Sequence, residues 1–328
     1  MYNFCTLFDS NYSSRGVSLY YSLEQHCSEF TLYIFAFDSK IANVLKQLNL
    51  KHAIIIPLSQ FEDVELLKVK PTRSIAEYCW TSTSSTILYV LENYGVESCT
   101  YLDADLFFYD SPKPLFDEMG DSSILLTEHR YSPEYNKELK SGKYCVQYMT
   151  FKNDERGLTA LRWWRERCLE WCYNRFEDGK FGDQLYLDDW TTRFEGVHEL
   201  QNLGGGLAAW NIQQYQFSRK GESITGSVIE TQKEFSPVFY HFHYLRFINN
   251  GTVELGRRTL TDNVLSTFYI PYIKTLLENG KRIKDIDGTI DPHGTATYNI
   301  SYKTPILWIY RKLKGVYNIF PLQTLLGK

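Results

Sequence analysis

The chain has 328 residues, a length that allows one large α/β domain with an appendage. Hydrophobic residues make up 43% of it and aromatic residues 16%, which is ample for a sizeable core. The formal net charge of −4 gives no general electrostatic footprint for nucleic acid, so we expect no nucleic-acid partner.

The seven cysteines form no CxxC pair, so neither a disulfide framework nor a zinc ribbon is indicated. Cys168 and Cys172 are four residues apart, a spacing that predicts one shared helix face. The first residues lack a charged n-region and a long apolar segment, and no run of about 18 apolar residues occurs. We therefore expect a cytoplasmic protein with reduced thiols.

The first hundred residues alternate between strand-like and helix-like segments. Strands are expected at residues 4–8, 31–37, 52–57 and 101–103, and helices at 16–27, 41–48 and 74–93. This alternation predicts a mainly parallel sheet flanked by helices, with ligands collecting beyond the carboxyl ends of its strands.

The pattern is less regular after residue 103. Strands are expected at 123–127, 146–151 and 238–244, a tryptophan-rich helix at 158–174, a turn entering a helix at 181–190, and a glycine-rich loop at 203–210. From about Thr259 the chain changes to a helix through Leu277, then a polar stretch and a basic aromatic tail. We therefore expect an α/β domain over residues 1–258 and a helical extension over 259–328.

The segment TYLDADLFFYDSP at residues 100–112 leads an apolar run into Asp103 and Asp105. Residues two apart on an extended chain point the same way, so both carboxylates can converge on one cation. Such oxygen ligands suit Mg²⁺ or Mn²⁺, which fill their other positions with water and substrate phosphate. The alternative is a turn in which each Asp bonds its own backbone. The buried apolar neighbours favour the metal site, because a cation relieves the cost of burying two like charges.

Five segments, in order along the chain, resemble those of nucleotide-sugar-dependent glycosyltransferases of the GT-A fold. TYLDADLFFYDSP is similar to their DxD element, and GKFGDQLYLDDW to their later acidic-Gln segment. The first nucleotide-contacting strand and turn of these enzymes resembles FCTLFDSNY. The Trp-Asn loop of family 8 resembles NLGGGLAAWN, and the terminal His-Phe-x-Gly segment resembles VFYHFHYLR. The resemblance covers residues 2–250 and implies a Rossmann-like GT-A catalytic domain.

The resemblance implies transfer of a sugar from a nucleotide diphosphate sugar, with UDP favoured, to a glycan or lipid-linked acceptor. A Mn²⁺ or Mg²⁺ ion would stabilise the leaving diphosphate as a Lewis acid. Its implied ligands are Asp103, Asp105 and His241, with His243 as the alternate. Tyr244 stands where the family commonly has glycine, so the choice between the two histidines stays open.

The nucleotide and its diphosphate are expected against residues from several segments. The implied donor-binding residues are Thr6, Asp9, Tyr12, Arg73, Asp103, Ala104, Asp105 and Arg246. Structural alternatives stay open for five of them. Turn chemistry in Asp9-Ser10-Asn11 is the alternative for Thr6, Asp9 and Tyr12. Arg73 can be a helix-start residue, and Arg246 a surface arginine.

At the sugar end, the resemblance implies that Asp183 binds sugar hydroxyls and that Gln184 lies beneath the anomeric carbon. An amide is a poor covalent nucleophile, so retention by front-face attack is implied, with the leaving phosphate as base. The alternative for Asp183 is a helix cap. Trp210 and Asn211 would border the acceptor, and the neighbouring glycines permit unusual backbone angles or close approach.

Two other functions stay open. Asp103-Ala104-Asp105 also has the spacing of the first motif in haloacid-dehalogenase-type phosphatases, with Asp103 as nucleophile, and Gly182-Asp183 with Asp188 imitates their last motif. Against this, Phe107 departs from the pattern, and these enzymes commonly open their domain with the first motif. A catalytically inactive sugar-binding module would share the GT-A fold and is separable only by assay.

The tail ILWIYRKLKGVYNIFPLQTLLGK mixes aromatic and basic residues. This mixture suits the anionic inner face of a membrane, where rings sit at headgroup depth and cations meet lipid phosphates. The acceptor would then be a lipid-linked intermediate of polysaccharide synthesis. The alternative is a helix packed on the catalytic domain. Gly315 and Pro321 predict that no long helix runs through the tail.

Overall fold

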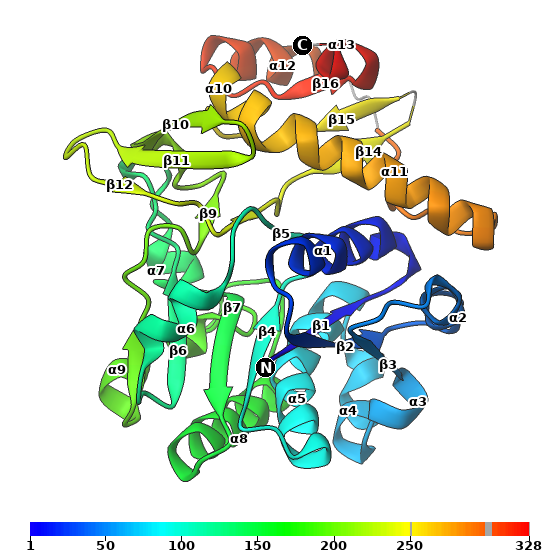
Figure 1. Cartoon of the computed structure of the whole chain (residues 1–328), viewed down its shortest axis with the longest axis vertical. Helices are drawn as coiled ribbons and strands as arrows, with labels where there is room; N and C mark the ends of the chain where they lie inside the picture. The colour runs from blue at the N-terminus through cyan, green and yellow to red at the C-terminus, as the bar shows by residue number, and fades with distance from the viewer. Residues whose placement is uncertain (250, 299–303, 328) are drawn as a thin grey trace.

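The computed structural model describes residues 1–249, 251–298 and 304–327 (Figure 1). A seven-stranded sheet with the order β3-β2-β1-β4-β7-β6-β8 runs through it. Its strands are β1 (Tyr2–Phe8), β2 (Phe30–Ala36), β3 (Ala53–Pro57), β4 (Ser98–Leu102), β6 (Ile124–Glu128), β7 (Tyr144–Lys152) and β8 (Val197–Glu199). β1 to β4 are parallel, and β7 is antiparallel to both β4 and β6. The expected mainly parallel α/β sheet is confirmed.

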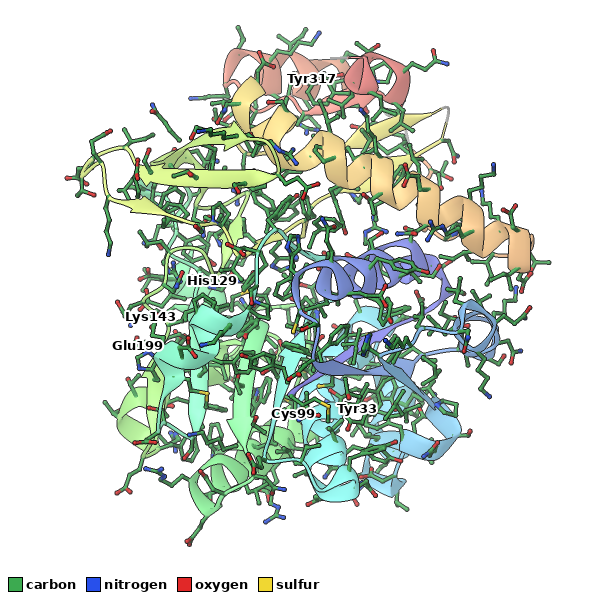
Figure 2. All side chains as sticks on the ribbon, in the orientation of Figure 1. Tyr33, Cys99, His129, Lys143, Glu199 and Tyr317 are labelled. Carbon is green, nitrogen blue, oxygen red and sulfur yellow. The ribbon has the colours of Figure 1, made fainter. Side chains whose placement is uncertain are left out.

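Helices cover both faces of this sheet, so its strands are apolar on both sides. Along β1, Phe4 and Phe8 pack in a cluster with α1 (Ser13–His26) and α2 (Ser39–Leu48), while Cys5 and Leu7 face α5 (Ile75–Tyr94) and α8 (Glu155–Glu170). Tyr33 and Cys99 belong to this second cluster, and Figure 2 shows them close to each other. The alternation follows from the two-residue period of a strand.

Local signals fix the ends of the long helices. Ser74 and Glu77 form a reciprocal capping box at the start of α5, and Gly95 ends that helix in a left-handed conformation with φ of 61°. Helix α8 ends at Glu170, four residues before its expected end, because Trp171 is extended. Cys172 therefore lies outside the helix, and the prediction that it shares a helix face with Cys168 is wrong. All seven cysteines are free thiols.

Short helices and small sheets complete the fold around the large sheet. The helices are α3 (Leu58–Phe61), α4 (Val64–Val69), α6 (Lys113–Met119), α7 (Glu138–Ser141) and α9 (Trp190–Arg193). Three small sheets have the orders β5-β13-β9, β10-β11-β12 and β14-β15-β16. Their strands are β5 (Leu106–Phe108), β9 (Leu207–Ala208), β10 (Tyr215–Lys220), β11 (Ser223–Val228), β12 (Glu234–Phe235), β13 (Phe239–His241), β14 (Arg246–Ile248), β15 (Thr252–Glu254) and β16 (Ile319–Pro321).

The C-terminal segment packs on the rest of the chain. It contains α10 (Asp262–Val264), α11 (Ile270–Ile286), α12 (Thr304–Leu313) and α13 (Leu322–Leu326). Helix α11 continues nine residues beyond its expected end at Leu277, because Ile283 is buried and Asn279 donates to Ser18 Oγ of α1 at 2.9 Å. In Figure 1, α11 crosses above α1, with α12 and α13 beyond it. The division at residue 258 stays a prediction.

Within the described ranges, no helix has both the length and the apolar character needed to cross a membrane.

Candidate active site

The two aspartates of the DxD segment lie in a tight turn between two strands. β4 ends at Leu102, and the Leu106 N–H donates to the Asp103 carbonyl at 3.1 Å as β5 begins. The carboxylates therefore do not converge by strand alternation, and that part of the prediction is wrong. Both nevertheless approach one imidazole: His241 Nε2 lies 3.1 Å from Asp105 Oδ1 and 3.6 Å from Asp103 Oδ2. The turn achieves the convergence that was expected of an extended strand.

His241 reaches the turn because its strand pairs with the strand that follows the turn. β13 is antiparallel to β5, with His241 opposite Leu106. The other ring nitrogen, Nδ1, lies 2.7 Å from Gln147 Oε1 on β7. An amide oxygen can only accept a hydrogen bond, so Nδ1 carries a proton. In the neutral ring, Nε2 then bears a lone pair that faces the carboxylates.

Burial and charge set the protonation of this cluster. Burial alone would lower the pKa of His241, but the charge of Asp105 and a hydrogen bond to it outweigh burial and hold the pKa well above its usual value. Burial alone would raise the pKa of Asp105, but the imidazolium holds it well below its usual range. Burial raises the pKa of Asp103 to about 6. The protonated imidazole of His241 thus supplies the positive charge that a metal cation would otherwise supply beside the carboxylates.

His243 completes the group. β13 ends at His241, so His243 lies in the following turn and not on the strand that was expected to reach Tyr244. One ligand atom each from Asp105, His241 and His243 lies within 4.8 Å of the others. The edge of the Trp210 ring contacts both imidazoles, with centroids 5.3 Å and 5.9 Å away.

The N-terminal turn contacts one of these carboxylates. The Tyr12 hydroxyl donates to Asp105 Oδ2 at 2.8 Å, and the Arg15 guanidinium lies over the Tyr12 ring at 4.3 Å. Asp9 caps the short 3₁₀ helix η1 (Ser10–Tyr12), with its carboxylate accepting from the Tyr12 N–H at 3.1 Å. Thr6 is fully buried in β1, and its hydroxyl has no hydrogen-bond partner among the described residues.

A cavity of about 760 Å³ opens beside the acidic turn. Its lining includes Asp103, Asp183, Gln184, Trp210, His241 and His243 from the sequence-based set. Residues that the sequence did not single out for this site also line it, namely Trp80, Tyr131, Lys137, Lys140, Arg175 and Arg258. The cavity therefore combines carboxylates, imidazoles, aromatic rings and four cationic side chains.

Asp183 and Gln184 enter the cavity from a turn that begins at Gly182, which has φ of 54°. The helix that follows is a short 3₁₀ helix, η4 (Leu185–Leu187), and Gln184 occupies its capping position without a side-chain bond. The alternative that Asp183 is a helix cap is therefore wrong. Burial and the nearby charge of Asp103 raise the pKa of Asp183 to about 8. The Gln184 side-chain amide donates to the Ser141 carbonyl.

The Trp-Asn loop is shaped by glycines and by its own polar groups. A Cβ on Gly204 would lie 2.0 Å from the Ser236 carbonyl oxygen, and Gly206 has φ of 93°, so close approach and a left-handed backbone both occur here. Asn211 is buried and joins the loop to the segment that follows β6: its amide donates to the His129 and Gly206 carbonyls, both at 2.8 Å. Trp210, not Asn211, faces the cavity.

Two arginines in the sequence-based set lie outside this cavity. The Arg73 guanidinium lies over the Tyr173 ring at 3.9 Å and donates to the Leu169 carbonyl at 3.3 Å. Arg246, on β14, pairs with Glu254 at 2.7 Å in a separate pocket. Arg258 lines the cavity, together with Lys137, Lys140 and Arg175. Its guanidinium lies over Tyr135 at 4.6 Å, and its buried Nε has no partner among the described residues.

Sequence signals for the missed residues were present but weak. Gln147 is a polar residue in the otherwise apolar strand YCVQYMTFK, which marks it as a side chain with a specific partner. Lys137, Lys140 and Arg258 lie in short basic stretches that read equally well as solvated surface.

Comparison with solved structures defines the fold. A crystal structure of the galactosyltransferase LgtC in complex with donor and acceptor sugar analogs matches 84% of this chain and 95% of its own, with a TM-score of 0.50 and 12% identity. The chain thus has the GT-A fold of glycosyltransferases. The finer likeness to family 8 stays a prediction.

No family model matches the sequence, but two curated proteins of Bacillus subtilis (strain 168) do. The uncharacterized protein YfnF is 36% identical over 269 residues, which cover 79% of this chain and 87% of YfnF. The uncharacterized protein YfnD is 29% identical over 281 residues, which cover 84% of this chain and 88% of YfnD. The chain belongs to the family of YfnF.

Proposed function

We propose that this protein is a metal-dependent glycosyltransferase that takes a sugar from a nucleotide diphosphate sugar, with UDP as the nucleotide. The observation that carries the proposal is the convergence of Asp103, Asp105 and His241 Nε2 at the edge of a cavity that also holds Asp183 and Gln184. These five side chains come from three separate segments of a GT-A fold.

The donor set fits a divalent cation. Asp103, Asp105 and His241 would hold it, and the mixture of carboxylates with one imidazole favours Mn²⁺ over Mg²⁺. Gln147 fixes the ring so that Nε2 faces the ion, as groups behind metal-ligating histidines commonly do. When bound, the ion supplies Lewis acidity to the leaving diphosphate.

The remaining side chains would contact different parts of the donor. Tyr12 and Asp9, which lie beside the acidic turn, would contact the nucleoside, and Arg258 would take the diphosphate-contacting role that was expected of Arg246. Asp183 would accept hydrogen bonds from sugar hydroxyls, and Gln184 would lie near the anomeric carbon. Since an amide is a poor nucleophile, we propose transfer with retention, in which the acceptor hydroxyl attacks from the face that the diphosphate leaves.

The acceptor is proposed to be a glycan or a lipid-linked glycan. Trp210 borders the cavity beside the histidines, where its ring can contact a saccharide. Helix α12 leaves Ile306, Ile309 and Leu313 strongly exposed, with the exposed Lys312 in its last turn and the exposed Lys314 directly after it. This combination supports peripheral binding to an anionic membrane surface.

A nucleotide-sugar screen tests the proposal. Each candidate donor is incubated with the full chain, with and without Mn²⁺, and both thermal unfolding and slow donor hydrolysis are followed. A true donor at 100 times its dissociation constant is expected to stabilise the protein by about 2.7 kcal/mol, and only when Mn²⁺ is present. Protection without hydrolysis of any donor would indicate an inactive sugar-binding module. Trapping of a phosphorylated Asp103 from a phosphate ester would instead establish the phosphatase alternative.

A further inference from the structure

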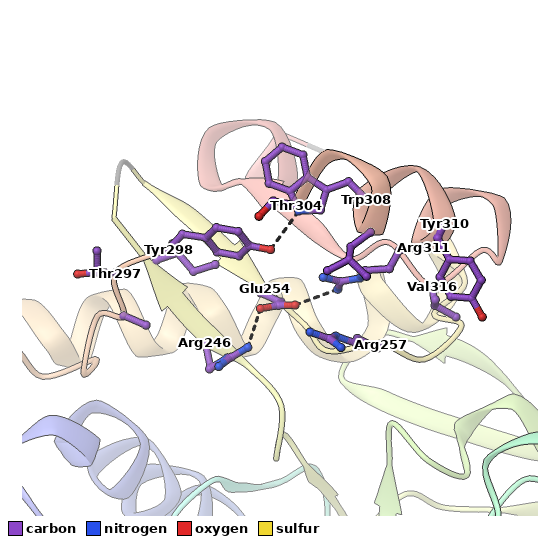
Figure 3. A pocket seen from close by; sticks show the side chains of 13 residues that line it. Arg246, Glu254, Arg257, Thr297, Tyr298, Thr304, Trp308, Tyr310, Arg311 and Val316 are labelled. Atoms are coloured by element: carbon purple, nitrogen blue, oxygen red, sulfur yellow. Dashed lines mark hydrogen bonds and ion pairs between the residues drawn. The ribbon is translucent and has the colours of Figure 1, made fainter. Parts of the chain in front are cut away.

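A second pocket, of about 600 Å³, lies between the β14–β15 hairpin and α12. Figure 3 shows Glu254 near its centre, with Arg246 on one side and Arg311 on the other, and with Arg257 beside them. None of these side chains lines the cavity beside the acidic turn.

The pocket carries an excess of positive charge. The Glu254 side chain is only 3% exposed, and its two oxygens lie 2.7 Å from Arg246 Nη2 and 2.9 Å from Arg311 Nη2. Among the described lining residues, this one carboxylate faces three guanidinium groups. Two positive charges are therefore left without a counter-charge in the pocket, which is the charge that a phosphate group complements.

The pocket also contains guanidinium donors without acceptors. The Arg257 side chain is exposed and makes no hydrogen bond or ion pair with any described residue. Arg311 is 5% exposed, and its buried Nε has no partner among the described residues, although its Nη2 also donates to the Gly256 carbonyl at 3.1 Å. Buried donors of this kind normally find an acceptor, so the unpartnered Nε of Arg311 points to a ligand.

Part of the pocket lining is aromatic and apolar. The Trp308 indole N–H donates to the Tyr298 hydroxyl at 3.0 Å, as Figure 3 shows, so the ring is held in place at the pocket wall. Leu307 and Val316 also line the pocket. A free anion would use only the arginines, whereas a phosphate attached to a larger organic body would also contact the aromatic and apolar part of the lining.

Arg257 and Arg258 connect this pocket with the active-site cavity. They are adjacent in the chain, yet Arg257 lines the second pocket and Arg258 lines the cavity beside the acidic turn. We propose that the second pocket binds a phosphate group carried by the acceptor, either a phosphorylated saccharide or the headgroup of a lipid carrier. The anion site stands on its own contacts, and its assignment to the acceptor rests on the proposed function.

The test uses the full chain and the variant Arg257→Ala, because Arg257 supports no described contact of the fold. Arg219→Ala, an exposed arginine on β10, is the matched control. Titration with inorganic phosphate is expected to show at least about a tenfold loss of affinity at this site for Arg257→Ala, the effect of losing a charge-assisted hydrogen bond. Crystals soaked in tungstate are expected to show an anomalous peak beside Arg257 and Arg311. Equal phosphate affinity in both variants, or a soaked pocket without a peak, would overturn the proposal.

Two further probes distinguish the source of the phosphate. Tighter binding of glucose 1-phosphate than of inorganic phosphate, lost in Arg257→Ala, supports a phosphorylated saccharide. Sedimentation with phosphatidic acid vesicles but not with phosphatidylcholine vesicles, lost in the same variant, supports a lipid headgroup. Donor hydrolysis is expected to be unchanged in Arg257→Ala. If the wild-type chain hydrolyses no nucleotide sugar but still binds phosphate in this pocket, the assignment to an acceptor fails while the anion site stands.

Discussion

His241 is held on both sides of its ring, which distinguishes it from its neighbour. Nδ1 is fixed by Gln147 at 2.7 Å, and Nε2 faces Asp105 at 3.1 Å. His243 has ring contacts with Trp210 and Tyr244, but no hydrogen bond to a described residue orients its imidazole. A metal ligand whose second nitrogen is fixed loses less freedom on binding, so His241 is the better candidate.

We therefore expect His241→Ala to reduce kcat/KM more than His243→Ala, by at least about tenfold, when both are measured across a Mn²⁺ titration. Excess Mn²⁺ should restore part of the loss, because the carboxylates remain. The reverse ranking would transfer the ligand role to His243. Two silent variants would remove this segment from the active site.

At the residue scale, the sequence identified the carboxylates but not that Arg258, rather than Arg246, lines the cavity. Asp103 and Asp105 were recognisable because two acids stand in an apolar run. Arg246 and Arg258 look alike in the sequence, and only strand pairing decides between them. β14 pairs with β15, which turns Arg246 toward Glu254, and the chain beyond β15 brings Arg258 back to the cavity.

At the scale of elements, the alternating first half of the sheet could be predicted because each helix carries its own caps. Ser74 with Glu77, and Asp154 before α8, are local signals. The small sheets have no such signal. Pairing of β13 with β5 joins residues more than a hundred positions apart, and it is this pairing that places His241. Periodicity within a segment says nothing about a distant partner.

The contact of the 287–294 segment with α1 makes folding stability depend on pH. Burial lowers the pKa of His293 to about 4, and the positive charges of Arg15 and Lys284 add to this while Asp291 opposes it. His293 Nδ1 lies 2.9 Å from Ser14 Oγ, and the ring stacks on Phe247 at 4.2 Å. The folded state therefore favours the neutral ring.

Above the unfolded pKa of about 6.5, His293 is neutral in both the folded and the unfolded state, and folding stability is fully present. As the pH falls from there toward 4, the unfolded state takes up a proton that the folded state does not, so stability is lost. We expect a loss on the order of 1–2 kcal/mol in the free energy of unfolding, reduced by the partial exposure of the ring. Urea unfolding of the wild type and of His293→Asn between pH 7 and pH 4 measures it. Parallel pH curves for the two proteins would contradict the expectation.

Helix α12 presents an apolar face to the outside. Ile306, Ile309 and Leu313 are 68%, 60% and 83% exposed, and their spacing places them on one side of the helix. Deleting the tail is a poor test, because β16 pairs with β15 and Leu325 is fully buried. Substitution of the exposed face avoids this damage.

The triple variant Ile306→Ser, Ile309→Ser and Leu313→Ser is expected to bind anionic vesicles at least about tenfold more weakly, since three apolar side chains no longer enter the lipid. Donor hydrolysis should not change. The matched control replaces Val64, Leu67 and Ile75, which are 77%, 51% and 71% exposed, by Ser. Equal vesicle sedimentation of the two triple variants and the wild type would remove the membrane proposal.

At the scale of the whole molecule, the fold class followed from the alternation of strands and helices, and the structure confirms it. The active-site cavity did not follow in the same way, because its walls come from the large sheet, strand β13, helices α5 and α7, and several loops. The second pocket was even less accessible to sequence reasoning. It is formed by the packing of α12 against the β14–β15 hairpin, which places Arg311 beside Glu254.

The account depends most on the metal-dependent binding of a nucleotide sugar by the acidic turn. Calorimetric titration of the donor found in the screen, with and without Mn²⁺, tests this directly in the wild type, in Asp103→Asn, and in Asp117→Asn as a surface control. Asp117 lies on α6 in an exposed pair with Lys113. The account predicts Mn²⁺-dependent binding in the wild type and in Asp117→Asn, and its loss in Asp103→Asn without a change in the unfolding temperature of the free protein. Unchanged Mn²⁺-dependent affinity in Asp103→Asn would contradict it.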